Sequence, residues 1–349
     1  MSLVNLSIFF DRSDLIYNTG EQITGHVAFK LNTIRNLTCI KLKIKGKAKV
    51  KWSDLVTTTD SKGKLQFGRV WRTSDEEYFK TVVPLDQQIG KFELTPGQYL
   101  YPFSVTLPPN IPASFVGIHG RIFYYAKVTV MFEKHDNAEK KSYFRVVNLL
   151  NLNHYPALRS PTVVERYRRF YQCCCFPAGK ISLTASVPRS GFAKNETIPL
   201  SLKANNDSFF SIREIFIYVN RKTEWRSGEN RKFTIEKLKT INIRALNSNT
   251  TRSWVESVQM PLAEFPFIEN CQIIRMRYEI QVKVDTENTN CDLDLFIPIS
   301  IGDIPLTERD PANEEDLPPS YNEVIQGAGT SLGESNHNLS SMSISTICS

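Results

Sequence analysis

Apolar residues recur at every second position in one segment of the chain after another. Residues 23–31 read ITGHVAFKL, and the same alternation returns at residues 122–130, 215–219 and 276–284. A period of two is that of a β-strand with one face against a core and the other in water. Helical periods are hard to find, and Pro, Gly, Asn and Asp separate the apolar segments at short intervals. The pattern predicts an all-β fold made of antiparallel sandwiches.

The chain also resembles itself, which indicates a duplicated domain. RIFYYAKVTV at residues 121–130 aligns with RMRYEIQVKV at residues 275–284, with Arg, Tyr and both Val at the same steps. Two landmarks precede this strand in both halves. Glu21 corresponds to Glu196, and the pair at 107–108, Leu-Pro, corresponds to Met-Pro at 260–261.

The two copies differ most in the middle, where the first is longer and residues 52–79 predict an extended hairpin. We therefore expect two homologous sandwiches, a connector between them and a tail. Their ranges are 1–155 for the first sandwich, 156–177 for the connector, 178–305 for the second sandwich and 306–349 for the tail.

The charge is distributed unevenly between body and tail. The chain carries a formal net charge of +7, yet residues 306–349 hold seven acidic residues and one basic residue. The tail is thus −6, which leaves +13 on the first 305 residues. The tail is rich in Ser, Asn and Gly and poor in apolar residues, so we expect it to be disordered. A basic body favours acidic partners, but no recognition module for nucleic acid accompanies the charge, so none is expected to bind.

A row of lysines is the densest charge feature of the body. In KLKIKGKAKVKW the lysines are Lys41, Lys43, Lys45, Lys47, Lys49 and Lys51, and apolar residues alternate with them. In a strand all six ammonium groups share one face. One interpretation is a half-buried strand whose solvated face is lysine, which would also suit the blunting of an exposed sheet edge. The other is a basic stripe that attracts an acidic partner such as anionic phospholipid headgroups or phosphorylated tails. The sequence leaves both open.

Patterns that carry catalysis or metal binding are missing from the sequence. The five histidines form no HExxH pair, and there is no GxSxG elbow and no glycine-rich phosphate loop. We therefore expect no enzyme, no catalytic residue, no metal and no cofactor.

The cysteines point to a reducing compartment. Seven are present without a CxxC spacing, and no apolar run reaches the roughly 18 residues of a membrane span. A cytoplasmic protein is expected. Cys173, Cys174 and Cys175 are successive, and neighbours on a strand face opposite sides, so they cannot share one metal ion. Buried thiols are favoured over acylation of this triplet.

A short proline motif stands in the acidic tail. In EEDLPPSYNEVI, Pro318 and Pro319 precede Tyr321 by the spacing Pro-Pro-x-Tyr. A Pro-Pro pair presets a polyproline II conformation, which aromatic-lined grooves recognise at little entropic cost. This is the form that WW domains bind, so Pro318, Pro319 and Tyr321 are predicted as a WW-domain ligand.

Taken together, these features resemble the α-arrestins, the arrestin domain-containing proteins. The matching segments are YNTGEQITGHVAF (17–29), IKGKAKVKW (44–52), YLYPFSVTLPPNIPASFVGIHGRIFYYAKV (99–128), GKISLTASVPRSGFAKNETIPL (179–200) and CQIIRMRYEIQVKV (271–284). The resemblance covers nearly the whole body and includes the tail motif. It implies two tandem arrestin-type, immunoglobulin-like β-sandwiches.

The resemblance also implies a function. Members of the family act as adaptors that recruit Nedd4-type HECT ubiquitin ligases through PPxY motifs to receptors or transporters, whose ubiquitination and endocytosis follow. The protein would then move from the cytoplasm to the plasma membrane and endosomes. Many relatives carry two such motifs, whereas one is found here. The alternative is a trafficking scaffold that acts without a ligase and binds cargo, coat proteins or anionic membrane.

Overall fold

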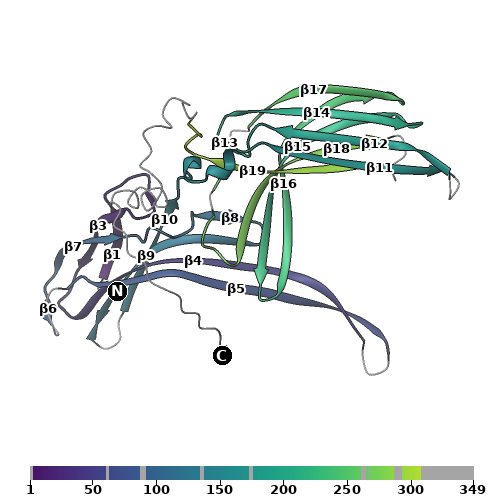
Figure 1. Cartoon of the computed structure of the whole chain (residues 1–349). Helices are drawn as coiled ribbons and strands as arrows, with labels where there is room; N and C mark the ends of the chain where they lie inside the picture. Colours follow the sequence, from purple (N-terminus) through teal and green to yellow (C-terminus); the bar gives the residue numbers. More distant parts are fainter. Residues whose placement is uncertain are drawn as a thin grey trace, which may run out of the picture. The chain divides into compact units, whose positions relative to one another are not determined.

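The computed structural model describes the folded body of the chain with short gaps (Figure 1). The described residues are 3–59, 63–86, 92–133, 137–172, 176–260, 265–266, 268–286 and 293–307. Pro318, Pro319, Tyr321 and the triplet at 173–175 lie outside these residues. The described part is almost entirely β-strand, so the all-β prediction is confirmed.

The first sandwich is built from two sheets. One sheet has the order β1 (Leu3–Phe10), β3 (Gln22–Leu31), β7 (Gly97–Thr106). The other has the order β2 (Ile16–Asn18), β10 (Asn137–Val147), β9 (Gly120–Phe132), β4 (Arg35–Thr59), β5 (Leu65–Pro84), with β6 (Phe92–Leu94) on β4 and β8 (Phe115–Gly117) on β9. Strands β4 and β5 form the extended hairpin expected within residues 52–79 (Figure 1).

The second sandwich repeats this topology. Its larger sheet has the order β13 (Gly191–Ala193), β19 (Leu293–Gly302), β18 (Ile274–Thr286), β15 (Ile212–Ser227), β16 (Asn230–Leu246). The other sheet has the order β11 (Thr162–Gln172), β12 (Phe176–Val187), β14 (Thr197–Ser208), β17 (Thr250–Gln259). In each sandwich the short first strand of the larger sheet is parallel to its neighbour. The strand order of the larger sheets is the same, and the other sheets share three strands, to which the second sandwich adds β11 at the edge; this supports the duplication inferred from the sequence.

The paired glutamates mark the same turn in both sandwiches. The carboxylate of Glu21 accepts a hydrogen bond from the backbone N–H of Asn18 (2.7 Å) and pairs with Arg12. Glu196 accepts from the backbone N–H of Ala193 (2.6 Å) and pairs with Arg189. Each glutamate therefore holds the chain at the point where the short parallel strand ends.

The residues around these glutamates repeat as well. The residue before each has a left-handed backbone, with φ of 78° at Gly20 and 63° at Asn195, which glycine and asparagine tolerate best. The backbone carbonyls of the two glutamates accept from Leu107 N (2.9 Å) and Met260 N (3.1 Å). The landmarks of the sequence repeat are thus one local structure that occurs twice.

Most of the expected connector belongs to the second sandwich. Residues 162–172 form β11, which pairs with β12 at the edge of its sheet. Edge strands of natural proteins carry charged side chains that discourage further pairing, and Arg166, Arg168 and Arg169 are exposed here. The link between the sandwiches therefore spans residues 148–161, between β10 and β11, and is shorter than the expected connector at 156–177. It contains two single 3₁₀ turns, Leu152–His154 and Pro156–Arg159.

The end of the body packs onto this link. Leu306 is buried with Leu150 and Leu152. Asp303 accepts a hydrogen bond from the backbone N–H of Leu150 (2.9 Å), and its other carboxylate oxygen pairs with Lys194. The segment after β19 is thus fixed beside the link as far as Leu306.

Each sandwich has its own hydrophobic core, and side chains of the second sandwich complete the core of the first, namely Trp225, Cys271, Ile273 and Ile274. Trp225 on β15 is 1% exposed and packs in the cluster of the first sandwich. Its ring stacks on Phe115 (centroids 6.0 Å apart) and meets His119 edge-on (5.8 Å). Gly117 makes room for it, since a Cβ there would lie 2.5 Å from Trp225 Cη2.

A carboxylate joins the two sandwiches at a second place. Glu76 on β5 accepts hydrogen bonds from the backbone N–H groups of Gln272 (2.9 Å) and Ile273 (3.3 Å), and Cys271 Sγ lies 3.6 Å from the same oxygen. Burial raises the pKa of the Cys271 thiol to about 11, so this thiol is protonated at neutral pH. Trp225 and Glu76 together define the seam between the sandwiches.

Replacing Trp225 tests the apolar part of the seam. We expect Trp225→Ala to lower the free energy of unfolding by about 3–5 kcal/mol, because it opens a cavity in the core of the first sandwich. Urea denaturation of the purified chain measures this loss. Trp71, which is 56% exposed, gives the control, since Trp71→Ala should change stability by less than about 0.5 kcal/mol. Equal stability of the two variants would contradict the packing of Trp225.

Glu76 and Glu77 form a matched pair for the polar part of the seam. Glu76→Ala leaves two backbone N–H groups without their carboxylate acceptor, which should cost about 1–3 kcal/mol. Hydrogen exchange at residues 272–273 should become faster. Glu77 is exposed and pairs only with Lys45 among the described residues, so Glu77→Ala should leave exchange at 272–273 unchanged. Faster exchange in both variants would argue against a specific role of Glu76.

Candidate functional site: a basic sheet face beside an interdomain pocket

The lysine row lies in the interior of the larger sheet of the first sandwich. Strand β4 pairs with β9 over Leu37–Val50 and with β5 over Lys41–Thr59. The even-numbered residues from Ile40 to Trp52 are buried, whereas the lysines point to the outer face. The row therefore lies on an outer sheet face and does not blunt a sheet edge, because both edges of β4 are hydrogen-bonded over Lys41–Val50.

Neighbouring strands extend the positive charge across this face. Residues directly opposite each other in an antiparallel pair share a face, so the strand register tells which residues of β5, β9 and β10 lie on the same face as the lysines. The described cations of the face are Lys41, Lys43, Lys45, Lys47, Lys49, Lys51, Arg69, Lys80, Arg121, Lys127 and Lys141, and its carboxylates are Asp75, Glu77 and Glu139. We call this set the basic face. Eleven cations stand there against three anions.

The three carboxylates each hold one lysine of the basic face. Lys45 pairs with Glu77, Lys49 Nζ lies 3.5 Å from Asp75, and Lys127 Nζ lies 2.6 Å from Glu139. In the described part of the chain, Lys41, Lys43, Lys47 and Lys51 form no ion pair. Burial, and then repulsion by Lys49, lowers the pKa of Lys47. A bound anion would relieve that repulsion.

Aromatic rings lie between the cations. Lys51 Nζ is 4.6 Å from the centroid of Trp71, and Lys141 Nζ is 3.7 Å from that of Tyr125 and 4.6 Å from that of Tyr143. Lys47 and Arg121 both lie over Phe123. These contacts hold the long side chains along the sheet, since a cation over a ring face is attracted by the ring quadrupole.

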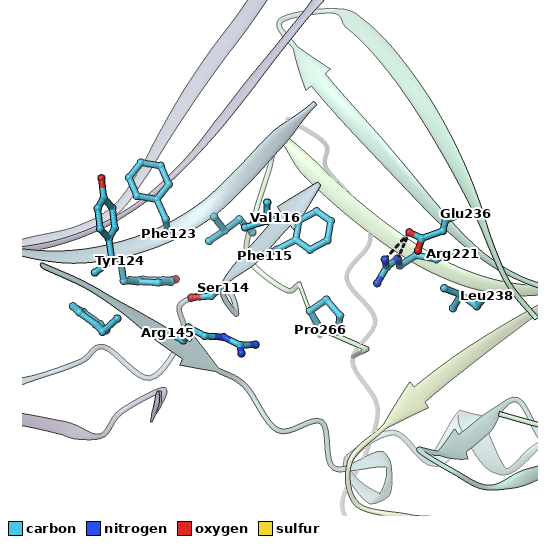
Figure 2. A pocket seen from close by; sticks show the side chains of 13 residues that line it. Ser114, Phe115, Val116, Phe123, Tyr124, Arg145, Arg221, Glu236, Leu238 and Pro266 are labelled. Atoms are coloured by element: carbon cyan, nitrogen blue, oxygen red, sulfur yellow. Dashed lines mark hydrogen bonds and ion pairs between the residues drawn. The ribbon is translucent and has the colours of Figure 1, made fainter. Parts of the chain in front are cut away.

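A pocket of about 430 Å³ lies next to the basic face, between the two sandwiches (Figure 2). Its walls are mostly apolar and come from β8, β9 and β10 on one side and from β15, β16 and Pro266 on the other. Figure 2 shows Phe115 and Val116 on one side of the pocket and Leu238 and Pro266 on the other. Phe123 and Tyr143 belong both to this pocket and to the surroundings of the basic face.

The polar groups of the pocket are mostly engaged with each other. Arg221 donates to Glu236 through Nε (3.2 Å) and Nη2 (2.5 Å), and the pair closes one wall (Figure 2). Tyr124 donates its hydroxyl to the carbonyl of Pro112, and burial raises the pKa of its phenol, which stays neutral. The pocket is large enough for a small ligand, and its walls suit an apolar group.

No group of three or more His, Cys, Asp and Glu side chains is arranged to hold a metal ion within the described residues. The same residues include no helix with the length and apolar character needed to cross a bilayer. The expected WW ligand lies outside them.

Sequence reasoning missed the pocket and Trp225. The lysine row can be recognised from its period of two. The pocket cannot be recognised in this way, because its walls come from residues that are more than a hundred positions apart. Trp225 stands in a polar stretch, RKTEWRS, which gives no sign that the ring enters another domain's core.

Comparison with known proteins agrees with this architecture. Residues 6–153 match the sequence model of the arrestin (or S-antigen) N-terminal domain, and residues 177–306 match that of the arrestin (or S-antigen) C-terminal domain. The chain is 27% identical over 305 residues to human arrestin domain-containing protein 4, with 85% of this chain and 71% of the relative covered.

Two further relatives have similar coverage. Human thioredoxin-interacting protein is 24% identical over 305 residues, which cover 85% of this chain and 74% of the relative. Arrestin domain-containing protein 17 of Caenorhabditis elegans is 25% identical over 320 residues, which cover 87% and 72%. Proteins with these domains are generally non-catalytic adaptors. With both arrestin domains matched in order on two sandwiches of the same topology, the chain belongs to the α-arrestin family.

Proposed function

We propose that this protein is a non-catalytic adaptor that brings a Nedd4-type HECT ubiquitin ligase to membrane cargo. The ligase binds Pro318, Pro319 and Tyr321 through a WW domain, and the sandwiches hold a receptor or transporter. Ubiquitination and endocytosis of the cargo follow. The observation that carries the proposal is a Pro-Pro-x-Tyr motif joined to a two-sandwich arrestin body.

The length of the tether supports this arrangement. Pro318 lies eleven positions after Thr307, the last described residue. Even fully extended, such a segment spans at most about 40 Å. A ligase bound at the motif is thereby kept close to whatever the body holds, and this raises its effective concentration at the cargo.

The protein works, on this proposal, in the cytoplasm and moves to the plasma membrane and endosomes with its cargo. Because one motif is present, a ligase with several WW domains cannot gain the roughly 10² to 10⁴ of avidity that a second site would add. Cargo or membrane contacts of the body must then help to hold the complex.

A second candidate is a trafficking scaffold that binds cargo, coat proteins or anionic membrane without a ligase. The basic face favours it, since eleven cations against three anions form a docking surface that needs no tail. The two candidates differ in whether the tail is required.

Mutation of Tyr321 tests ligase recruitment. We expect Tyr321→Ala in the full chain to weaken binding to a Nedd4-type WW domain by about 30-fold or more, the loss typical of a hot-spot aromatic residue. Isothermal titration calorimetry measures it. Ser320 occupies the unspecified position of the motif, so Ser320→Ala should bind like the wild type. Equal binding by the Tyr321 variant would refute the proposed ligand.

Removal of the tail separates the two candidates. The truncation should begin at residue 308, because Leu306 is buried in the body. If the protein is a ligase adaptor, the truncated chain should still bind cargo but should no longer support its ubiquitination or internalisation. Internalisation at the wild-type rate, measured by surface labelling of the co-precipitated cargo, would favour the scaffold.

A further inference from the structure

The hairpin of β4 and β5 extends beyond the rest of its sheet. Pairing between β4 and β9 ends at Val50, opposite Gly120, whereas pairing between β4 and β5 continues to Thr59, opposite Leu65. Past Val50 the two strands therefore continue without β9, and Figure 1 shows them as a long arm. The outer face of the arm is continuous with the sheet face that carries the lysine row.

Large apolar side chains occupy the outer face of the arm. They are Leu55 (77% exposed), Leu65 (62%), Phe67 (78%) and Trp71 (56%), which we call the apolar tip. The register has no irregularity between Lys47 and Thr59, so the odd-numbered residues of both strands stay on the face of the lysines. Lys51 Nζ, 4.6 Å from the Trp71 ring, joins the lysine row to the apolar tip.

Exposed apolar side chains that adjoin one another mark interaction sites on proteins that are otherwise well packed. The inner side of the same hairpin is buried where it adjoins the core of the first sandwich, as Trp52 is 3% exposed. The tip residues are therefore exposed although the chain has an adjacent core in which similar residues are buried.

The basic face is broad and flat. Its cations lie on four adjacent strands, β5, β4, β9 and β10. The lysine row from Lys41 to Lys51 runs for about 34 Å at 3.4 Å per residue. Over Lys41–Val50 the backbone groups of β4 and β9 are already used on both edges, so a peptide cannot pair with these two strands along the lysine row.

We propose that the basic face and the apolar tip together form a docking surface for an anionic phospholipid bilayer. The cations contact the headgroups, while Leu55, Leu65, Phe67 and Trp71 enter the interfacial region of the bilayer. An acidic peptide would neutralise the lysines but would leave the apolar tip in water. A bilayer accounts for both features, because amphipathic docking combines cations for headgroups with aromatic and aliphatic side chains for the acyl boundary. The docking is independent of the tail motif and of any ligase.

Vesicle flotation of the full chain tests the docking. Vesicles of phosphatidylcholine alone are compared with vesicles that also contain phosphatidylserine. We expect binding to the anionic vesicles only, and weaker binding as salt is raised. A cation near such a surface contributes about fivefold to binding, so the triple variant Lys41→Gln, Lys43→Gln, Lys51→Gln should bind about 100-fold more weakly.

A matched control removes the same charge elsewhere. The triple variant Lys30→Gln, Lys203→Gln, Lys239→Gln has the same net charge, and its lysines lie on β3, β14 and β16. It should bind within about threefold of the wild type, since screened charges outside the contact contribute little. Equal losses in the two triple variants would show that net charge alone drives binding and would overturn the proposal.

The apolar tip is tested by substitution and by fluorescence. Leu55→Ser combined with Phe67→Ser should weaken binding at least tenfold, because burial of two such side chains is lost. Phe209→Ser combined with Val255→Ser replaces comparably exposed residues (74% and 62%) of the second sandwich and should leave binding unchanged. Unchanged unfolding midpoints verify that each variant folds.

Trp71 reports directly on insertion. Phospholipids with brominated acyl chains should quench the fluorescence of the bound wild type, and the quenching should disappear in Trp71→Phe. Binding without this quenching would overturn the insertion of the tip.

Failure to bind anionic vesicles, together with tight binding of soluble polyglutamate to the basic face, would show that the partner is an acidic peptide and not a bilayer. Loss of the WW ligand by Tyr321→Ala should affect none of these measurements, so the membrane-docking proposal and the ligase-adaptor proposal can each be refuted without the other.

Discussion

The period of two along β4 is the constraint on which the first sandwich depends. Its even-numbered residues, Leu42, Ile44, Ala48 and Val50, are buried in the core, and its odd-numbered lysines must therefore face outward. A shift of one residue would place six ammonium groups in the core, so the register is strongly fixed. The same alternation continues to Thr59 and thereby decides which side of the hairpin carries Leu55. Core, charge and exposed tip follow from one pattern.

The seam between the sandwiches depends on a different principle. Trp225 and Glu76 each cross from one sandwich to the other, one by apolar burial and one by a carboxylate that accepts backbone N–H groups. Such contacts fix the two sandwiches to each other more firmly than a flexible linker can. A fixed seam gives the pocket of Figure 2 its defined walls, because these walls come from both sandwiches.

Sequence reasoning reached the fold but only part of the site. Alternation and internal similarity are enough to predict two sandwiches. The repeat also aligned Glu21 with Glu196, and the two residues do stand at the same turn. The lysine row could be predicted because it follows from local alternation. Its position in the interior of the sheet could not be predicted, since strand order depends on long-range pairing that no local pattern contains. Trp225 and the pocket were missed because the residues that meet there are distant in sequence, and the strand β11 was mistaken for a connector because its polar, arginine-rich pattern is that of an edge.

The burial of Leu306 determines where the tail is attached. Because Leu306 packs on Leu150 and Leu152, and Asp303 is held by Leu150 and Lys194, the end of the body is fixed beside the link. The body therefore ends at the junction, where residues that follow the first sandwich and residues that end the second are side by side. Residues that follow Leu306 are thus attached at the junction and not at a remote end of either sandwich.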